Sequence, residues 1–155
     1  DKYNWIKLAL SENIGPITFK DLINYFKTPE NALKEIPSFA KKGGRRRPIE
    51  IASNEVVDFQ LNEARKLGID IIPSCDEKYP FLLRQTDDCP AILYACGKSD
   101  LLNQKSVAIV GSRNSSLNGQ NLTRRLAHDL VDNNYCVISG MAKGIDTAAH
   151  QGALA

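Results

Sequence analysis

The sequence lacks the apolar stretches that membrane and secreted proteins carry. No run of about 18 apolar residues, the length that crosses a bilayer, occurs in the 155 residues. The charged start, apolar stretch and cleavage site of a signal peptide are also missing. We therefore expect a cytoplasmic protein that does not associate with membranes. The chain starts at Asp1 and stops at Ala155 inside an apparent helix, so we also expect a fragment of a longer protein.

Metal-binding patterns are missing as well. The four cysteines form no C-x-x-C pair, and the two histidines, His128 and His150, lie far from them in the sequence. We therefore predict no metal site. Most of the cysteines stand beside apolar residues, which is typical of buried, reduced thiols rather than of a disulfide framework.

An excess of charge of either sign is absent. The chain has 20 lysine and arginine residues against 18 aspartate and glutamate residues, which gives a formal net charge of +2. Attraction of an anionic partner must therefore come from a local cluster of charges rather than from the whole chain. Hydrophobic residues make up 43% of the sequence, which is enough for the core of one globular domain or of two small ones.

The first part of the chain has the periodicity of helices. Apolar residues between positions 4 and 36 recur every three or four residues and predict three short helices. We expect Thr18 to cap the second helix and Pro29 to open the third. Residues 54–67 predict a fourth helix, which Gly68 ends as a C-cap glycine. These elements predict a small helical module.

A basic loop separates the third and fourth predicted helices. Residues 41–48 hold five basic side chains and two glycines, a composition too flexible and too self-repelling for a helix interior. The run from Lys41 to Arg47 could touch a nucleic acid or could form an ordinary solvated charge run. No aromatic residue lies within it to stack on a base, and both interpretations stay open.

After Gly68 the pattern changes to short apolar runs between turn-forming residues, which predict buried strands. These runs are residues 69–72, 91–95, 107–110 and 135–138. An amphipathic helix joins the last two, and another helix begins near Asp146, so a right-handed βαβα unit starts a parallel sheet. The sequence thus predicts a helical module over residues 1–68 and the first part of a Rossmann-like α/β domain over residues 69–155.

Two loops of this βαβα unit have the composition of anion-binding loops. Each follows a strand, precedes a helix, and combines glycine and serine with one cation, Arg113 or Lys143. The carboxyl ends of neighbouring parallel strands meet at one edge of a sheet, so we expect the two loops to lie roughly 5 to 10 Å apart. The candidate phosphate-binding residues are Gly111, Ser112, Arg113, Ser139, Gly140, Lys143 and Gly144.

These loops do not match the two standard nucleotide patterns. The dinucleotide fingerprint G-x-G-x-x-G fails because Arg113 occupies its second glycine position, and a Walker loop fails because Ser116 replaces its second glycine. We therefore predict no nucleotide cofactor. One phosphate backbone could touch both loops, whereas either loop alone could equally be a plain turn with a solvated cation.

A catalytic group is suggested only weakly. His150 lies four residues after Asp146 and shares its helix face, as a base and its carboxylate partner would. That helix carries no obvious nucleophile, and Asp146 is equally well placed to cap the helix. We therefore interpret His150 as structural.

Three ordered motifs resemble the DNA-processing protein A family, which is also called DprA or Smf. They are YPFLLRQTDDCPAILYACGK (residues 79–98), VAIVGSRNSSLNG (residues 107–119) and ISGMAKGIDTAAHQGAL (residues 138–154). The helical start is similar to the family's N-terminal sterile-alpha-motif-like (SAM-like) module. The resemblance implies a SAM-like helical module followed by a truncated Rossmann-like domain.

The resemblance also implies a function. Family members are bacterial cytoplasmic proteins that bind single-stranded DNA, protect it during natural transformation and load the recombinase RecA onto it, without catalysis or a cofactor. The family's Gly-Ser-Arg loop maps onto Gly111, Ser112 and Arg113, and Lys143 stands where the family usually has arginine. The homodimer surface and the rest of the sheet would follow Ala155, so an unpaired strand edge or an uncovered apolar face is expected here.

Two alternatives accompany this interpretation. An enzyme acting on nucleotides could share the fold, as the Rossmann-like phosphoribohydrolases do, but their PGGxGT motif and the glutamate that follows it are absent. In the helical module, the segment 14–16 resembles the turn of helix-hairpin-helix DNA binders, and an ordinary interhelical turn explains the same residues.

Overall fold

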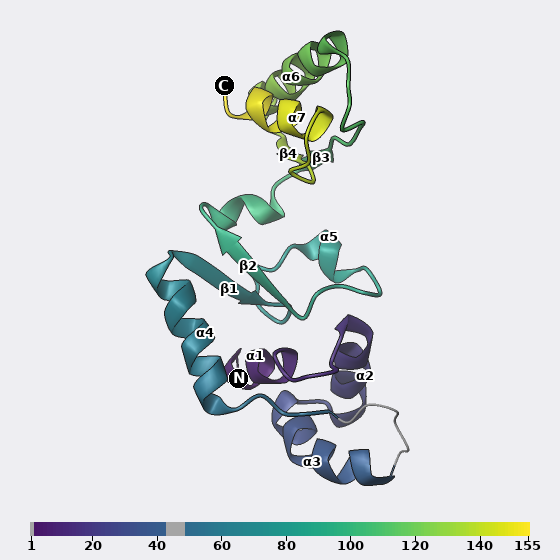
Figure 1. Cartoon of the computed structure of the whole chain (residues 1–155), viewed down its shortest axis with the longest axis vertical. Coiled ribbons are helices and arrows are strands. Elements are labelled where there is room, and N and C mark those ends of the chain that lie inside the picture. Colours follow the sequence, from purple (N-terminus) through teal and green to yellow (C-terminus); the bar gives the residue numbers. More distant parts are fainter. Residues whose placement is uncertain (1, 43–48) are drawn as a thin grey trace. The chain divides into compact units, whose positions relative to one another are not determined.

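The structure, a computed structural model, describes residues 2–42 and 49–155, so most of the basic loop lies outside the described residues. The chain forms two compact units, Asp1–Leu102 and Asn103–Ala155 (Figure 1). Among the described residues, the first unit holds five α-helices and a two-stranded sheet, and the second holds a two-stranded sheet with two α-helices. The fold is therefore a helical N-terminal region followed by α/β structure, as predicted.

The first four helices of the first unit agree with the sequence pattern. They are α1 (Lys2–Ala9), α2 (Pro16–Phe26), α3 (Pro29–Lys42) and α4 (Asn54–Lys66). The apolar positions that predicted α1 to α3 form one buried core, to which Leu8, Phe19 and Ile36 each contribute a side chain less than 5% exposed. Burial of these side chains against one another is what stabilises three helices that are each too short to be stable alone.

Most of the predicted helix ends are confirmed. Pro29 opens α3, and Gly68 follows α4 with a φ of +65°, the left-handed conformation that glycine adopts at low cost. The prediction for Thr18 is wrong, because α2 already begins at Pro16 and Gly15 occupies the N-cap position. Proline's fixed φ suits the first helical position, so the helix starts at Pro16, three residues earlier than a cap at Thr18 would allow.

The first two predicted strands form a sheet of their own. Strands β1 (Ile69–Pro73) and β2 (Ile92–Cys96) pair antiparallel, with Ile69 opposite Cys96 and Pro73 opposite Ile92. They are joined through the short helix α5 (Phe81–Arg84). The parallel sheet therefore starts at the third strand of the chain, and the antiparallel pair packs with α4 in the first unit.

The segment between these two strands is anchored by Tyr79. Its side chain is 1% exposed, and its hydroxyl donates a 2.7 Å hydrogen bond to the carbonyl oxygen of Pro90. Burial raises the pKa of the Tyr79 hydroxyl to about 12, so it stays a donor throughout the physiological range.

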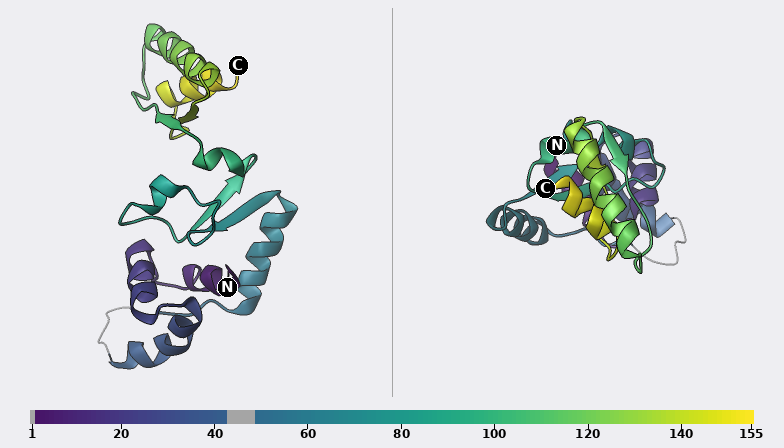
Figure 2. Two further views of the ribbon diagram at one scale, coloured as in Figure 1. Left: turned by 180° about the vertical axis from the view of Figure 1, so that it is seen from behind. Right: turned by 90° about the horizontal axis from the view of Figure 1, so that it is seen from above.

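The second unit is the predicted βαβα unit. It consists of β3 (Ser106–Ala108), α6 (Leu117–Asp132), β4 (Cys136–Ile138) and α7 (Ile145–Ala153), and a short 3₁₀ helix, Ser99–Asn103, precedes it. Strands β3 and β4 are parallel, with Ser106 opposite Cys136 and Ala108 opposite Ile138. Helices α6 and α7 lie side by side (Figure 2), and their core is built on Ile109, Ala127 and Ala149.

Large apolar side chains remain exposed in this unit, as the sequence led us to expect. Val110 and Ile138, which end the two strand runs, are 78% and 53% exposed, and Leu122 on α6 is 66% exposed. Burying such surface against another element would stabilise the unit by roughly 25 cal/mol per Å². The core on α6 and α7 takes up Ile109, which follows β3, and Val137 of β4.

The predicted domain boundary and the compact units differ. The prediction placed the boundary at Gly68, where the pattern changes from helices to strands. The units divide after Leu102 because β1 contacts α4 and α1, and β2 pairs with β1.

The cysteines are less buried than expected. All four thiols are free, but Cys75 and Cys96 are exposed, and Cys89 and Cys136 are half-buried. Cys75 lies in the turn after β1 and Cys96 ends β2, at margins of a sheet that cannot enclose them.

None of the helices in the described ranges is long and apolar enough to cross a membrane.

Candidate phosphate-binding site

The first loop runs from the end of β3 to the start of α6. Ser116 caps α6 by accepting a 3.1 Å hydrogen bond from the backbone N–H of Gly119, and the Ser112 hydroxyl accepts one of 3.1 Å from the N–H of Asn114. Gly111, Ser112 and Arg113 are all exposed. Within the described part of the chain the Arg113 guanidinium has no hydrogen bond or ion pair, so its donors are available to a ligand.

The second loop, residues 139–144, runs from β4 to α7. The Ser139 hydroxyl donates a 2.7 Å hydrogen bond to the carbonyl oxygen of Ile109, which ties this loop to the end of the neighbouring strand. Lys143 is exposed, and Gly144 has a φ of +81° and precedes α7 directly. The Ser139 hydroxyl therefore donates within the protein and is not available to a ligand, whereas the exposed Lys143 is available.

The two loops touch each other through their backbones. The N–H of Ile145 donates a 3.2 Å hydrogen bond to the carbonyl oxygen of Ser112. A Cβ on Gly144 would lie 2.3 Å from that oxygen, so only glycine permits this approach. The structure thus brings both cation-bearing loops to the same edge of the sheet, as their sequence positions predicted.

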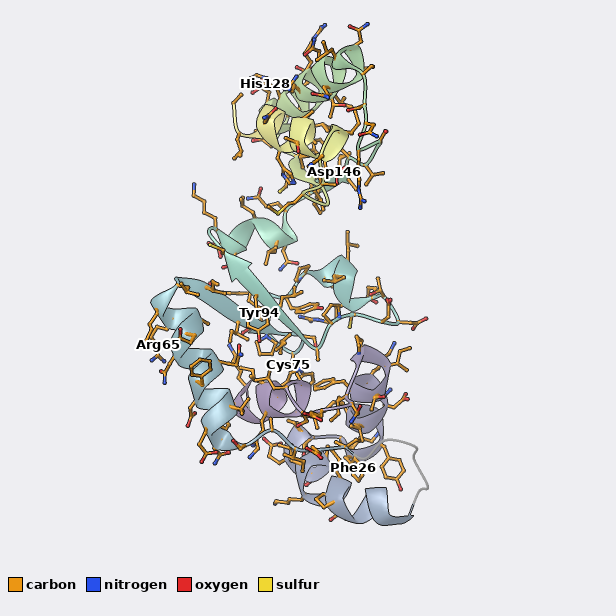
Figure 3. All side chains as sticks on the ribbon, in the orientation of Figure 1. Phe26, Arg65, Cys75, Tyr94, His128 and Asp146 are labelled. Carbon is orange, nitrogen blue, oxygen red and sulfur yellow. The ribbon has the colours of Figure 1, made fainter. Side chains whose placement is uncertain are left out.

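Asp146 has a role that the sequence pattern did not predict. It lies in the first turn of α7 (Figure 3), and its side chain is 6% exposed. The side chain does not cap α7; its Oδ2 accepts hydrogen bonds from the N–H groups of Gly140 (3.0 Å) and Ala142 (3.4 Å) in the second loop. Two amide groups that could have bound a phosphate are therefore occupied by a carboxylate of the protein. An aspartate in the first turn after a glycine-rich loop was the only signal for this contact.

The electrostatic field at the sheet edge where the two loops meet comes from their cations and from the ends of α6 and α7. The first turn of α6 contains no acidic residue, so the positive end of its dipole is not neutralised there. The first turn of α7 contains Asp146, which offsets the dipole of that helix. An anion is therefore favoured at the Arg113 loop, with Lys143 contributing from the side of the second loop.

The residues described here do not form a catalytic or metal-binding constellation. His150 is half-buried, and its Nε2 has no hydrogen-bond partner in the described ranges, whereas a general base would be oriented by one. His128 lies on α6 with Nδ1 3.3 Å from Oδ2 of Asp132. The described residues also hold no group of three or more potential metal ligands.

Two protein-family models match the chain. Residues 70–155 match a family described as DNA recombination-mediator protein A, and residues 1–62 match one described as DprA-like N-terminal HHH domain. Together the two matches cover α1 to α3, most of α4 and the two loops of the second unit.

Individual relatives agree with this match. The chain is 30% identical to Protein Smf of Synechocystis over 162 residues, which is 97% of this chain and 40% of that protein. It is 34% identical to DNA processing protein DprA of Bacillus subtilis, over 63% of this chain and 35% of that protein. The chain thus spans 40% or less of these curated relatives.

A solved structure also matches. The X-ray structure of DNA processing protein A from Streptococcus pneumoniae superposes with a TM-score of 0.66 at 31% identity, and covers 99% of this chain and 52% of that chain. A likeness of this extent includes both compact units.

Proposed function

Because the chain belongs to the DNA recombination-mediator protein A family, we propose that it binds single-stranded DNA through the two adjoining loops and serves in DNA uptake by natural transformation. The observation that carries this proposal is the pair of exposed cations, Arg113 and Lys143, on loops held together at one sheet edge. The relatives that bear the name DNA processing protein support the class of function.

The composition of the site favours contact with the phosphate backbone. Arg113 offers a planar set of donors without a partner among the described residues, and Lys143 offers a point charge. Neither loop carries an aromatic side chain, and Asn114 supplies the one carboxamide of the two loops. Contacts of this kind position DNA without reading its sequence.

The proposal includes three further points that rest on the family. The protein acts by binding and not by catalysis, it works in the cytoplasm, and it loads RecA onto the bound strand as a homodimer. Exposed apolar side chains of the second unit, such as Val110, Leu122 and Ile138, offer a surface on which another protein segment could pack.

Replacing Arg113 with alanine should weaken binding of the full-length protein to single-stranded oligonucleotides by about tenfold to a hundredfold, because a charge-assisted contact is lost. The loss should be equal for unrelated base sequences, and fluorescence anisotropy measures it. Arg125→Ala, which removes the same charge from an exposed position on α6, is the matched control and should leave affinity nearly unchanged. Equal affinities for the Arg113 variant and the parent protein would remove this loop from the DNA site.

A further inference from the structure

The structure assigns Asp146 as a positioning residue for the DNA site: its buried carboxylate fixes the second loop, and through that loop the backbone that carries Arg113. The inference deepens the proposed DNA binding and rests on it. Asp146 itself touches no ligand in this account, since its Oδ2 is already engaged with two amides of the protein.

Asp146 and the next residue, Thr147, bind the backbone in the middle of the second loop through hydrogen bonds. Oδ2 of Asp146 accepts from the N–H groups of Gly140 and Ala142, at 3.0 and 3.4 Å. The carbonyl oxygen of Ala142 in turn accepts from the N–H of Thr147 at 3.1 Å and from its hydroxyl at 2.7 Å. Both polar groups of the Ala142 backbone are thus bonded to the first turn of α7, so the loop has little freedom to rearrange.

The fit around the carboxylate is close. A Cβ on Gly140 would lie 2.9 Å from Oδ2 of Asp146, so glycine is needed for the amide to approach the carboxylate. The side chain of Asp146 is 6% exposed. Hydrogen bonds from amides to a buried carboxylate are charge-assisted and stronger than those between neutral groups, so these two contacts have a large influence on the loop.

The constraint extends to Arg113 through the start of α7. Gly144 is pressed against the backbone of the first loop, where a Cβ would lie 2.3 Å from the carbonyl oxygen of Ser112 and 2.6 Å from that of Arg113. The next N–H, that of Ile145, donates to the same Ser112 oxygen. Because Asp146 directly follows Ile145, the carboxylate and the Arg113 backbone are linked by three consecutive residues. A shift of the second loop must therefore displace the first.

The acceptor atom and the charge of Asp146 have separable effects. Alanine removes both, whereas asparagine keeps one oxygen that can accept from the Gly140 amide and removes the negative charge. A carboxylate near a phosphate site opposes DNA electrostatically, so we attribute the benefit of Asp146 to the hydrogen bonds that its side chain accepts. Asp146→Asn is therefore expected to keep the loops in place and to bind DNA at least as tightly as Asp146→Ala.

The test combines hydrogen exchange with DNA titration in the full-length protein. In Asp146→Ala, exchange should be at least tenfold faster in peptides that cover Gly140 and Ala142, and faster also in those that cover residues 111–116. Affinity for a single-stranded oligonucleotide should fall about fivefold to tenfold. Asp146→Asn should restore most of the protection and the affinity. Asp129→Ala, an exposed site on α6, is the charge-matched control and should change neither.

Two results would overturn the inference. One is a folded Asp146→Ala protein with unchanged exchange in the first loop, and the other is unchanged DNA affinity in that variant while Arg113→Ala binds weakly. If Arg113→Ala also binds normally, the proposed DNA site is wrong, and the exchange data still decide whether Asp146 fixes the loops. If Asp146→Ala fails to fold, the exchange and affinity of Asp146→Asn decide, and loss of both in that variant contradicts the role of the acceptor oxygen.

Discussion

Replacing Gly144 with alanine is expected to destabilise the second unit by about 2 to 5 kcal/mol and to abolish binding of single-stranded DNA. Gly144 has a φ of +81° and a ψ of −119°, a region that residues with a side chain avoid. The added Cβ would also lie 2.3 Å from the carbonyl oxygen of Ser112 and force the two loops apart. Hydrogen exchange of peptides from residues 103–155 measures the stability, and anisotropy measures the binding.

Gly97→Ala is the control for this prediction. Gly97 also has a positive φ, +95°, but a Cβ there would have nothing within 4 Å, so the variant carries backbone strain without a collision. We expect it to cost only about 1 kcal/mol and to leave DNA affinity unchanged. A Gly144 variant that behaves like the Gly97 variant would show that the two loops do not need their close approach.

Gly152→Ala should have the second largest effect, through the packing of α6 against α7. A Cβ on Gly152 would lie 2.2 Å from the backbone carbonyl oxygen of Arg124, and backbone cannot move aside as a flexible side chain can. Overpacking of this kind costs about 1 to 3 kcal/mol, more than the gain in helix propensity from glycine to alanine. Thermal unfolding should show a lower midpoint for residues 103–155.

Gly119→Ala is a matched control on the facing helix. A Cβ there would meet only side-chain atoms, Ser116 Oγ at 3.4 Å and Ile145 Cδ1 at 3.7 Å, which are ordinary contacts. The same substitution should therefore be neutral or stabilise α6 by up to about 1 kcal/mol. If both variants have the same midpoint, the close contact between α6 and α7 does not limit stability.

The sequence was sufficient to predict the elements and the meeting of the two loops. Helical periodicity and strong end signals, such as Pro29 and Gly68, are local, so they located the helices of the first unit. The alternation of strand and helix from residue 107 onward determined a parallel pair, and parallel pairing brings the ends of β3 and β4 to one edge. The adjacency of the Arg113 loop and the Lys143 loop therefore followed from the parallel topology alone.

Other features depend on contacts that no local pattern specifies. The runs that form β1 and β2 were predicted only as buried strands, because their antiparallel pairing depends on the long connection through α5 and on packing with α4. The orientation of Asp146 depends on the path of the loop before it, because capping of α7 and bonding to Gly140 are both compatible with its position in the sequence. Burial of cysteines could not be inferred from apolar neighbours when the sheet has an open margin.

The central claim is that Arg113 and Lys143 bind one phosphate backbone together. The salt dependence of single-stranded DNA binding tests it most directly, measured for the full-length protein, Arg113→Ala, Lys143→Ala and the double variant. Each phosphate contact contributes about 0.7 to the slope of log affinity against log salt for single strands. We predict that each single variant flattens the slope by about 0.7 and the double variant by about 1.4. Equal slopes of log affinity against log salt for all four proteins would contradict the claim.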